Sequence, residues 1–302
     1  MRFKLLIIVV MVLVLAACSA SDKRTKEAKL GEPSTVEAMI ESFADTGEIV
    51  LSKHTAANWQ VPLSGLLNLD HPKAKEAGLV DRVEPIALYV YVLEHPRHGT
   101  FLVDSGISTR FIDAENNPDV AFVVKKAMGT DTLEVLKTTE ELAEQADEIT
   151  GVFLTHIHLD HIMGLTDLDD QVPVFIGAGD ASAKHFNHLA TRGTTDRLLA
   201  HTKVLQEWQF ADQPVIDVFE DGSLWAIATP GHTPGSVSYL ANTTDGLQLM
   251  LGDTSHTRWG WDNKVEPGSY TMDGQANAEA IAMLTDLVEQ HPSITVHPGH
   301  QE

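Results

Sequence analysis

The chain has 302 residues, enough for one large domain or two small ones, and 43% of them are hydrophobic, which suffices for a substantial core. Lysine and arginine number 21 against 43 aspartates and glutamates, so the net charge is −22. Such an acidic chain lacks the basic face that binds phosphates, which argues against a nucleic-acid partner and disfavours polyanionic substrates.

The N-terminus has the pattern of a targeting signal. Two basic residues precede an apolar run, residues 5–17, which is too short to span a bilayer as a mature helix. The run ends in Leu-Ala-Ala-Cys and resembles the lipobox of bacterial lipoproteins, in which the cysteine is lipidated. We therefore predict a signal peptide over residues 1–17 and a membrane anchor at Cys18. An ordinary secretory signal with an incidental cysteine is the alternative.

Cys18 is the only cysteine, so we expect no intramolecular disulfide and no thiol ligand. The serine that follows it resembles the outer-membrane sorting pattern of Gram-negative lipoproteins, which predicts a location on the periplasmic face of the cell envelope. Residues 18–34 are polar and of mixed charge, with almost no large apolar side chains, and predict a flexible tether. Alternating strand and helix signals without a long linker then predict a single α/β domain over residues 35–302.

The strand signal is strong at residues 86–93 and 100–104, two β-rich runs around a turn with proline and glycine, which predict a hairpin. His95 and His98 lie in the turn and are expected in solvent. The second run ends in Asp104. Before this hairpin, the motif-poor stretch from Trp59 to Leu69 is either a loop over a pocket or ordinary packing.

The densest cluster of candidate metal ligands follows a short apolar run, residues 151–154, which predicts a buried strand. The sequence Thr-His-Ile-His-Leu-Asp-His comes directly after it. Side chains at positions i and i+2 of an extended segment point the same way, so His156 and His158 can bind one ion. Asp160 and His161 lie where the chain turns and can face a second ion. Imidazole and carboxylate are ligands that zinc prefers; a solvated, histidine-rich loop is the alternative.

Three further predicted strands end in residues of the same type. The run at 223–229 leads into a Pro-Gly-His-Thr-Pro-Gly-Ser loop that presents His232. The run at 247–251 ends at Asp253, which follows a glycine, and a C-terminal strand is followed by His300 within Pro-Gly-His. Four separate strand ends therefore offer metal ligands.

Two other patterns are not predicted to bind a cofactor or a metal. Gly-Ala-Gly-Asp at 177–180 begins like a dinucleotide-binding fingerprint but lacks its third glycine and an acidic partner, so it predicts a strand-to-helix turn. His185, His188 and His201 lie in a polar, helical region and are expected at the surface or in local packing.

With these motifs in order, the chain resembles the metallo-β-lactamase-fold superfamily from about Ile86 to His300, and Asp104 in Leu-Val-Asp-Ser-Gly matches the family's first, structural aspartate. The resemblance implies an α/β fold, a four-layer αβ/βα sandwich of two mixed β-sheets flanked by helices. It also implies two bound ions, most simply two Zn²⁺, with iron, manganese or mixed occupancy as alternatives. The implied ligands are His156, His158 and His232 for one ion, Asp160, His161 and His300 for the other, and Asp253 as the bridge.

Two cations that share a water lower its pKa from 15.7 to about 7, which yields hydroxide for attack on a carbonyl polarised by one ion. Asp160, a ligand that also faces this water, is the candidate to orient it and to carry a proton. The expected partner is a small-molecule carbonyl substrate. No Gly-x-Ser-x-Gly elbow or P-loop competes with this interpretation.

The bridging Asp253 sets the chain apart from the true β-lactamases of this fold. The chain ends at Glu302, soon after His300, so the C-terminal domain of glyoxalase II-type thioesterases is not expected. The compact lactonase-like branch remains, including the acyl-homoserine lactonases. Those enzymes carry a tyrosine three residues after the bridging aspartate, where this chain has His256. His256 either takes over carbonyl polarisation or proton donation, or indicates a different substrate.

The aromatic residues that follow, Trp259, Trp261 and Tyr270, either line an apolar pocket or serve packing. Alternative functions on the same fold are an iron-dependent oxidoreductase of the persulfide dioxygenase type, a thioesterase or phosphoesterase, and a non-catalytic binding lipoprotein. The sequence predicts neither the natural substrate nor the oligomeric state.

Overall fold

The computed structural model describes residues 19–45, 47–146, 148–185 and 188–302. The predicted signal peptide and Cys18 lie outside these residues. Within them, no helix combines the length and the hydrophobicity needed to cross a bilayer.

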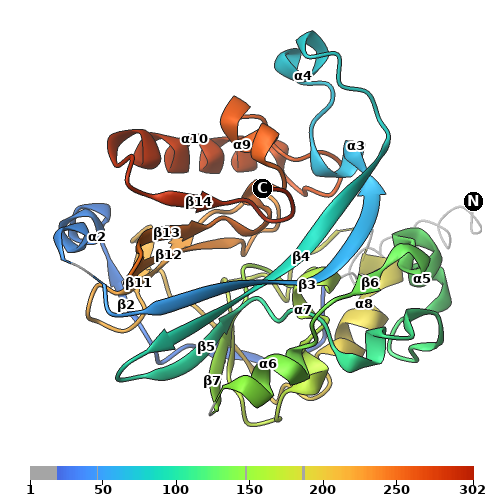
Figure 1. The fold of residues 1–302 in the computed structure, drawn as a ribbon, viewed down its shortest axis with the longest axis horizontal. Helices are drawn as coiled ribbons and strands as arrows, with labels where there is room; N and C mark the ends of the chain where they lie inside the picture. Colours follow the sequence, from blue (N-terminus) through green and yellow to red (C-terminus); the bar gives the residue numbers. More distant parts are fainter. Residues whose placement is uncertain (1–18, 46, 147, 186–187) are drawn as a thin grey trace, which may run out of the picture.

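The strands form two mixed sheets (Figure 1). The order in the first sheet is β1 (Thr25–Glu27), β9 (Leu205–Glu207), β8 (Val174–Ile176), β7 (Ile149–Phe153), β5 (Gly99–Val103), β4 (Val83–His95), β3 (Val50–Pro62) and β6 (Glu134–Val135). The order in the second sheet is β14 (Thr295–His297), β13 (Gly246–Met250), β12 (Val237–Thr243), β11 (Leu224–Ala228), β10 (Val215–Asp217) and β2 (Glu32–Ser34).

Helices cover the outer face of each sheet. The helices packed on the first sheet are α5 (Phe122–Met128), α6 (Thr139–Gln145), α7 (Leu159–Ile162) and α8 (His188–Leu198). Those packed on the second sheet are α2 (Val36–Glu41), α9 (Arg258–Asn263) and α10 (Gly274–Gln290). The short helices α3 (Leu63–Leu66) and α4 (Pro72–Glu76) connect β3 to β4, and α4 projects from the top of the molecule in Figure 1. The predicted four-layer sandwich is confirmed.

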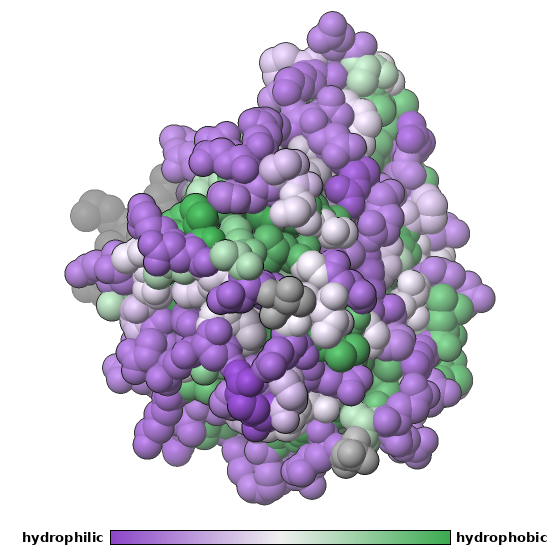
Figure 2. Space-filling model, turned by 60° about the vertical axis from the view of Figure 1, so that its left-hand side comes forward, coloured by the Kyte–Doolittle hydropathy of each residue, from purple (hydrophilic) through white to green (hydrophobic). Residues whose placement is uncertain are grey.

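Strand periodicity explains the layers, because neighbouring side chains of a strand point to opposite faces of its sheet. Val152 of β7 packs under the helices, whereas the next residue, Phe153, packs between the sheets. In β11, Trp225 faces the helices of the second sheet and Ala226 faces the other sheet. Aromatic rings fill the space between the sheets; the Trp208 ring stacks 4.8 Å from that of Phe175. Outside these layers, the face shown in Figure 2 is mostly hydrophilic, and one group of its hydrophobic residues lies in a hollow in the upper half.

The flexible tether predicted for residues 18–34 is wrong for the part that the structure describes. Residues 25–27 form β1 and pair in parallel with β9, while residues 32–34 form β2 and pair antiparallel with β10. Both are edge strands, which are held by backbone N–H and C=O groups and need no apolar side chains. For this reason the polar composition of the segment did not reveal them, and the domain begins well before residue 35.

The β4–β5 hairpin is confirmed, and His98 in its turn is exposed as predicted, but His95 is not. His95 is only 4% exposed, and its ring lies 4.5 Å from the ring of His98 and 4.8 Å from that of Phe219. The Nε2 of His95 donates to Asp221 (3.1 Å), and its Nδ1 accepts the backbone N–H of Arg97 (3.1 Å). The polar partners of the ring are therefore supplied by the protein rather than by water.

Candidate metal centre

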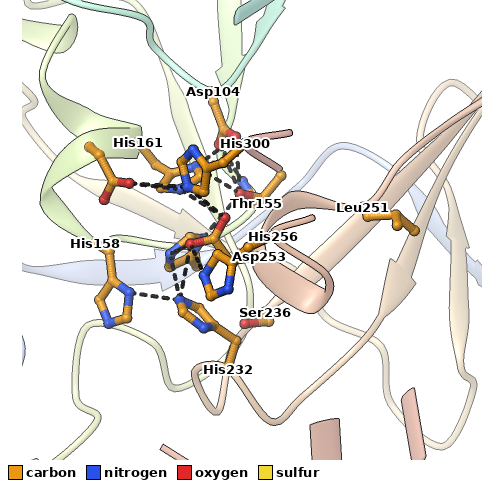
Figure 3. Close-up of polar contacts among 12 residues, drawn as sticks. Asp104, Thr155, His158, His161, His232, Ser236, Leu251, Asp253, His256 and His300 are labelled. Atoms are coloured by element: carbon orange, nitrogen blue, oxygen red, sulfur yellow. Dashed lines mark hydrogen bonds and ion pairs between the residues drawn. The ribbon is translucent and has the colours of Figure 1, made fainter. Parts of the chain in front are cut away.

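The predicted ligands converge because the strands that precede them end at the same edge of the sandwich. β11 and β13 are both antiparallel to β12, and β14 is parallel to β13. These three strands therefore run in one direction, and the loops after them carry His232, Asp253 and His300. β7 of the facing sheet supplies the remaining ligands through the loop before α7 and through its first turn. Figure 3 shows these side chains pointing toward one another.

The first ligand group consists of His156, His158, His232 and Asp253. Within it, the Nε2 of His232 lies 2.8 Å from the Nδ1 of His158 and 3.2 Å from the Nε2 of His156. The Oδ2 of Asp253 lies 3.3 Å from the Nε2 of His232 and 3.6 Å from that of His156. His156 and His232 are fully buried.

The second ligand group consists of Asp160, His161, His300 and again Asp253. The Oδ1 of Asp253 lies 3.1 Å from the Nε2 of His300 and 3.3 Å from that of His161. The Oδ2 of Asp160 lies 3.3 Å from the same atom of His300. One carboxylate thus faces both groups, Oδ2 toward the first and Oδ1 toward the second, as a bridging ligand would.

Burial lowers the pKa of the His156, His158 and His232 imidazoles, that of His158 to about 4. These rings are neutral at pH 7, and a neutral imidazole has the lone pair that a metal requires.

Carboxylates outweigh burial in the second group. Asp104, Asp253 and Asp160 raise the pKa of His161 well above its usual value, although burial opposes this. Against the same opposing burial, Asp253 and Asp160 raise the pKa of His300 to about 10. The negative potential that holds these protons would hold a cation equally well.

Two observations test whether divalent metal ions fit these residues. The buried Nε2 of His161 and Oδ1 of Asp253 have no hydrogen-bond partner, and both face the second group. In the first group three imidazoles direct nitrogen atoms at one another, and with neutral rings a single N–H of His232 would have to serve both of its neighbours. A shared cation at each group would satisfy them, and histidine with carboxylate is a donor set for zinc and related transition metals.

The surroundings fix the orientation of the ligands. The Nδ1 of His161 donates to Asp104 (2.8 Å), and that of His300 donates to the carbonyl oxygen of Ala87 (2.9 Å). Outer-shell acceptors of this kind fix the tautomer that leaves Nε2 free for a metal. Asp104 also accepts the backbone N–H of Thr155 (2.8 Å), and its left-handed backbone (φ 57°) supports its predicted structural role.

Two glycines permit the close packing around Asp253. Gly252 has φ +53°, a conformation that other residues rarely adopt, and a Cβ there would lie 2.6 Å from the Cβ of Thr155. A Cβ on Gly299 would lie 2.6 Å from the Oδ1 of Asp253. The glycines that precede Asp253 and His300 in the sequence motifs are therefore needed for space.

Asp180 is a site residue that the sequence analysis missed. It is fully buried, and its Oδ2 accepts the backbone N–H of Ile157 (2.8 Å), the residue between two histidine ligands. Burial raises the pKa of Asp180 to about 6, while Thr233 and Gly235 in the His232 loop act in the opposite direction. The turn before it approaches that loop closely, since a Cβ on Gly177 would lie 1.8 Å from the oxygen of Gly235. Asp180 thus joins the loops that carry the first ligand group. It follows the end of β8, the pattern that identified the ligands.

His256 lies beside both ligand groups and is 1% exposed. Its Nδ1 donates to the carbonyl oxygen of Leu66 (3.0 Å), and its Nε2 lies 3.0 Å from the Oδ2 of Asp253. The carbonyl of Leu66 comes from α3, and nothing in the sequence indicated it.

A cavity of about 490 Å³ opens over the ligands. Of the three aromatic residues left open by the sequence, Tyr270 lines this cavity, whereas Trp259 and Trp261 pack in the cores. The stretch from Trp59 to Leu69 also contributes to the wall. The larger apolar lining residues are Trp59, Val61, Pro62, Leu66, Ile86, Met128, Ile157, Leu159, Tyr270 and Met272. His185 and His188, expected in surface or local packing, line it as well. No lysine or arginine is among the described residues that line it.

A third group of possible ligands lies at the turn of the β4–β5 hairpin and consists of His95, His98 and Asp221. Both ring nitrogens of His95 are already bonded, Nε2 to Asp221 and Nδ1 to backbone N–H groups. Asp221 also pairs with Arg97. These contacts satisfy His95 and Asp221 without a metal.

The chain is similar to known proteins in sequence and in fold. The sequence model of the Metallo-beta-lactamase superfamily matches residues 84–300, which include all seven ligands. The N-acyl homoserine lactonase AttM of Agrobacterium fabrum is 35% identical over 100 residues, which cover 31% of this chain and 36% of AttM. The gamma-lactamase FDB1 of Fusarium pseudograminearum is 24% identical over 200 residues, which cover 56% of this chain and 45% of FDB1. The matches thus span less than half the length of both curated relatives.

Among solved structures, AidC, a dizinc quorum-quenching lactonase, superposes with a TM-score of 0.58 at 15% identity over 91% of this chain and 92% of AidC. At this identity the likeness is one of fold.

Proposed function

The chain belongs to the metallo-beta-lactamase superfamily, and on that premise we propose that it is a dinuclear metal-dependent hydrolase of ester or lactone bonds in small, uncharged molecules. One observation carries the proposal: two complete ligand groups share Asp253 beneath a cavity with an apolar wall. The matches to an N-acyl homoserine lactonase and a gamma-lactamase, both of which act on cyclic carbonyl compounds, support it.

The residues would hold two ions, which we propose to be Zn²⁺, with iron or manganese as alternatives. The first would be held by His156, His158 and His232, the second by Asp160, His161 and His300, and Asp253 would contribute to both. When bound, a metal pair supplies Lewis acidity, which polarises a carbonyl oxygen and lowers the pKa of water toward about 7.

Asp160 is proposed to orient the attacking water and to carry its proton. Its carboxylate is the ligand that remains 19% exposed, and it lines the cavity. Because His161 and His300 lower its pKa against the effect of burial, Asp160 is ionised at pH 7 and can accept a hydrogen bond from water.

His256 is proposed to position Asp253 and to face the carbonyl group of the substrate. Its ring is fixed by the Leu66 carbonyl on one side and lies against Asp253 and the cavity on the other. If it faces the substrate, His256→Phe lowers kcat more than it changes KM, whereas a purely structural role would show as lost stability at unchanged kcat per folded molecule.

The cavity favours an uncharged substrate. A carboxylate or phosphate group in an apolar pocket needs a cationic partner, and none of the described lining residues is a lysine or arginine. Its volume of about 490 Å³ lies within the range of small-molecule sites. Lactones and simple esters therefore suit it better than glutathione thioesters or phosphodiesters. The complete second ligand group likewise favours a hydrolase over the alternative mononuclear iron oxidoreductase.

The test uses the full-length protein, purified in detergent, with its metal content measured by mass spectrometry. We expect hydrolysis of lactones and esters in a panel that also contains thioesters, phosphoesters and β-lactams, with chelation abolishing activity. Asp160→Ala should lose activity, while Asp245→Ala, in an exposed turn, should retain it. Metal-replete protein that hydrolyses no member of the panel would overturn the proposal.

We also propose that Cys18 anchors the enzyme to a membrane of the cell envelope, as the resemblance of residues 15–18 to a lipobox implies. Cells fed radiolabelled palmitate should label the protein, and Cys18→Ser should abolish the label. Equal labelling of both forms would refute the anchor.

A further inference from the structure

Residues 19–22, here called the N-terminal wall, pack on the domain, and one of them lines the cavity. Ala20 is 6% exposed and lines the cavity. These residues precede the stretch that matches the family, residues 84–300, so membership of the family does not account for their position.

Hydrogen bonds fix the N-terminal wall. The backbone N–H of Ala20 donates to the oxygen of Ala183 (2.9 Å), and that of Ser21 donates to the oxygen of Ala181 (3.0 Å). The hydroxyl of Ser21 donates to Asp196 of α8 (2.5 Å), and the backbone N–H of Asp22 donates to the same oxygen (2.9 Å). Strand β1 follows at once and pairs with β9. The N-terminal wall is therefore held in the folded domain by specific hydrogen bonds.

The neighbours of Ala20 in the cavity wall are mostly small. We call this part the helical side of the cavity, because it combines the N-terminal wall with α5, α8 and the turn before α8. Its lining residues are Ala20, Ala127, Met128, Ala183, His185, His188, Ala190, Thr191 and Thr195. Four of these nine residues are alanines, so part of the space there exists because their side chains are short, and a longer side chain at one of them would fill it.

The same cavity is lined by His158, Asp160, Asp253 and His300 of the ligand groups. A substrate with its carbonyl group at the ligands would extend its remaining part along the cavity. On the helical side it would meet the methyl groups of the alanines and the thioether of Met128 beside histidine and threonine side chains, with no lysine or arginine among the described residues. The alanine and methionine surface accepts a hydrocarbon arm, and an anionic arm would find no lysine or arginine partner there.

We propose that the N-terminal wall, through Ala20, closes the binding compartment for the apolar arm of the substrate and limits the length of that arm. The inference rests on the proposed hydrolase function and specifies its substrate: a lactone or ester that carries a hydrocarbon chain.

The test compares Ala20→Leu with wild type in the full-length protein, using acyl-lactones with chains of increasing length. Leucine fills space on the helical side, so the ratio of kcat/KM for the longest chain to that for the shortest should fall about tenfold or more, since one methylene in such a pocket is worth about 10-fold to 200-fold. Ala28→Leu is the matched control. It lies in the same segment but packs against the core between the sheets, and it should leave the ratio unchanged.

A second measurement separates this inference from the proposed reaction. The uncharged fluorescent probe N-phenyl-1-naphthylamine should bind the metal-free protein, and Ala20→Leu should weaken binding about tenfold while Ala28→Leu does not. Unaltered secondary structure by circular dichroism would show that both variants fold. If no lactone is hydrolysed but Ala20→Leu weakens probe binding, the role of the N-terminal wall is supported and the proposed hydrolase function is refuted. An unchanged chain-length ratio or unchanged probe binding in folded Ala20→Leu would overturn the inference.

Discussion

The metal centre and the N-terminal segment, residues 19–34, are both precisely positioned, yet the physical origin of their positions differs. The centre depends on side chains, namely imidazoles and carboxylates at strand ends. Two of the imidazoles are held by hydrogen bonds to Asp104 and to the carbonyl oxygen of Ala87. The segment depends on the backbone, which pairs with the edges of both sheets at β9 and β10. Side-chain chemistry can be recognised in a sequence, whereas edge pairing is available to almost any sequence. The following predictions probe that difference, from the largest expected effect to the smallest.

Asp253→Asn should affect both ligand groups at once, because each uses one oxygen of this carboxylate. We expect both metals to be lost or weakened and the hydrolysis rate to fall about a thousandfold or more, since a metal ion supplies several kcal/mol and each 1.4 kcal/mol is a factor of ten. Metal analysis and kcat measure the outcome, with the exposed Asp245→Asn as control. Retention of two metals per chain would contradict the bridging role.

Asp180→Asn should lower the metal affinity of the first ligand group by about 10-fold to 100-fold, the usual effect of removing a partner that orients ligands. The amide accepts less strongly from the N–H of Ile157 and therefore holds the segment between His156 and His158 less firmly. Competition with a chelator measures the affinity. Asp217→Asn is the matched control, since that carboxylate also accepts a backbone N–H, from Gly222 (2.9 Å), away from the site. Equal affinities in the two variants would refute the positioning role.

Asp180 should also make the stability of the metal-free protein depend on pH. Burial raises its pKa from 3.8 to about 6, so the folded state binds more protons than the unfolded state in this window, and stability decreases as pH rises through it. Asparagine does not titrate, so Asp180→Asn removes this decrease in stability. Between about pH 4 and pH 7 the difference in unfolding free energy should move in favour of the variant by up to about 3 kcal/mol. Urea denaturation at both pH values measures it; a difference independent of pH would show that Asp180 does not titrate in this window.

Ser21→Ala should have the smallest effect, a loss of about 1 to 2 kcal/mol of unfolding free energy, because a buried hydroxyl no longer donates to the Asp196 carboxylate. The amides of β1 should exchange with solvent hydrogen slowly in wild type and faster in the variant. Ser182→Ala, whose exposed hydroxyl donates to the oxygen of Gly179, is the control. Exchange of the β1 amides at unprotected rates in wild type would restore the tether interpretation.

The same difference between side-chain chemistry and backbone pairing explains which features could be predicted from the sequence. The layers and the convergence of all seven ligands were predictable from the resemblance to the family, which rests on motifs in which apolar runs end in histidine or aspartate, as at His156, His232 and Asp253. The burial of His95 was not, since it depends on Phe219 and Asp221, more than a hundred residues away. Asp180 follows a strand end, as the ligands do, but the sequence analysis assigned it to a turn. The contact of His256 with the carbonyl of Leu66 could not be predicted from residue types, because every residue has a carbonyl.

β1 and β2 are separated by four residues, yet they belong to different sheets, and their partners β9 and β10 lie near residues 205 and 215. This early segment of the chain therefore connects the two sheets by pairing with strands that lie about 180 residues later in the sequence. Closing so long a loop is slow. During synthesis these early residues must wait until most of the chain has emerged, so the binding cavity would acquire its N-terminal boundary only as one of the last events of folding.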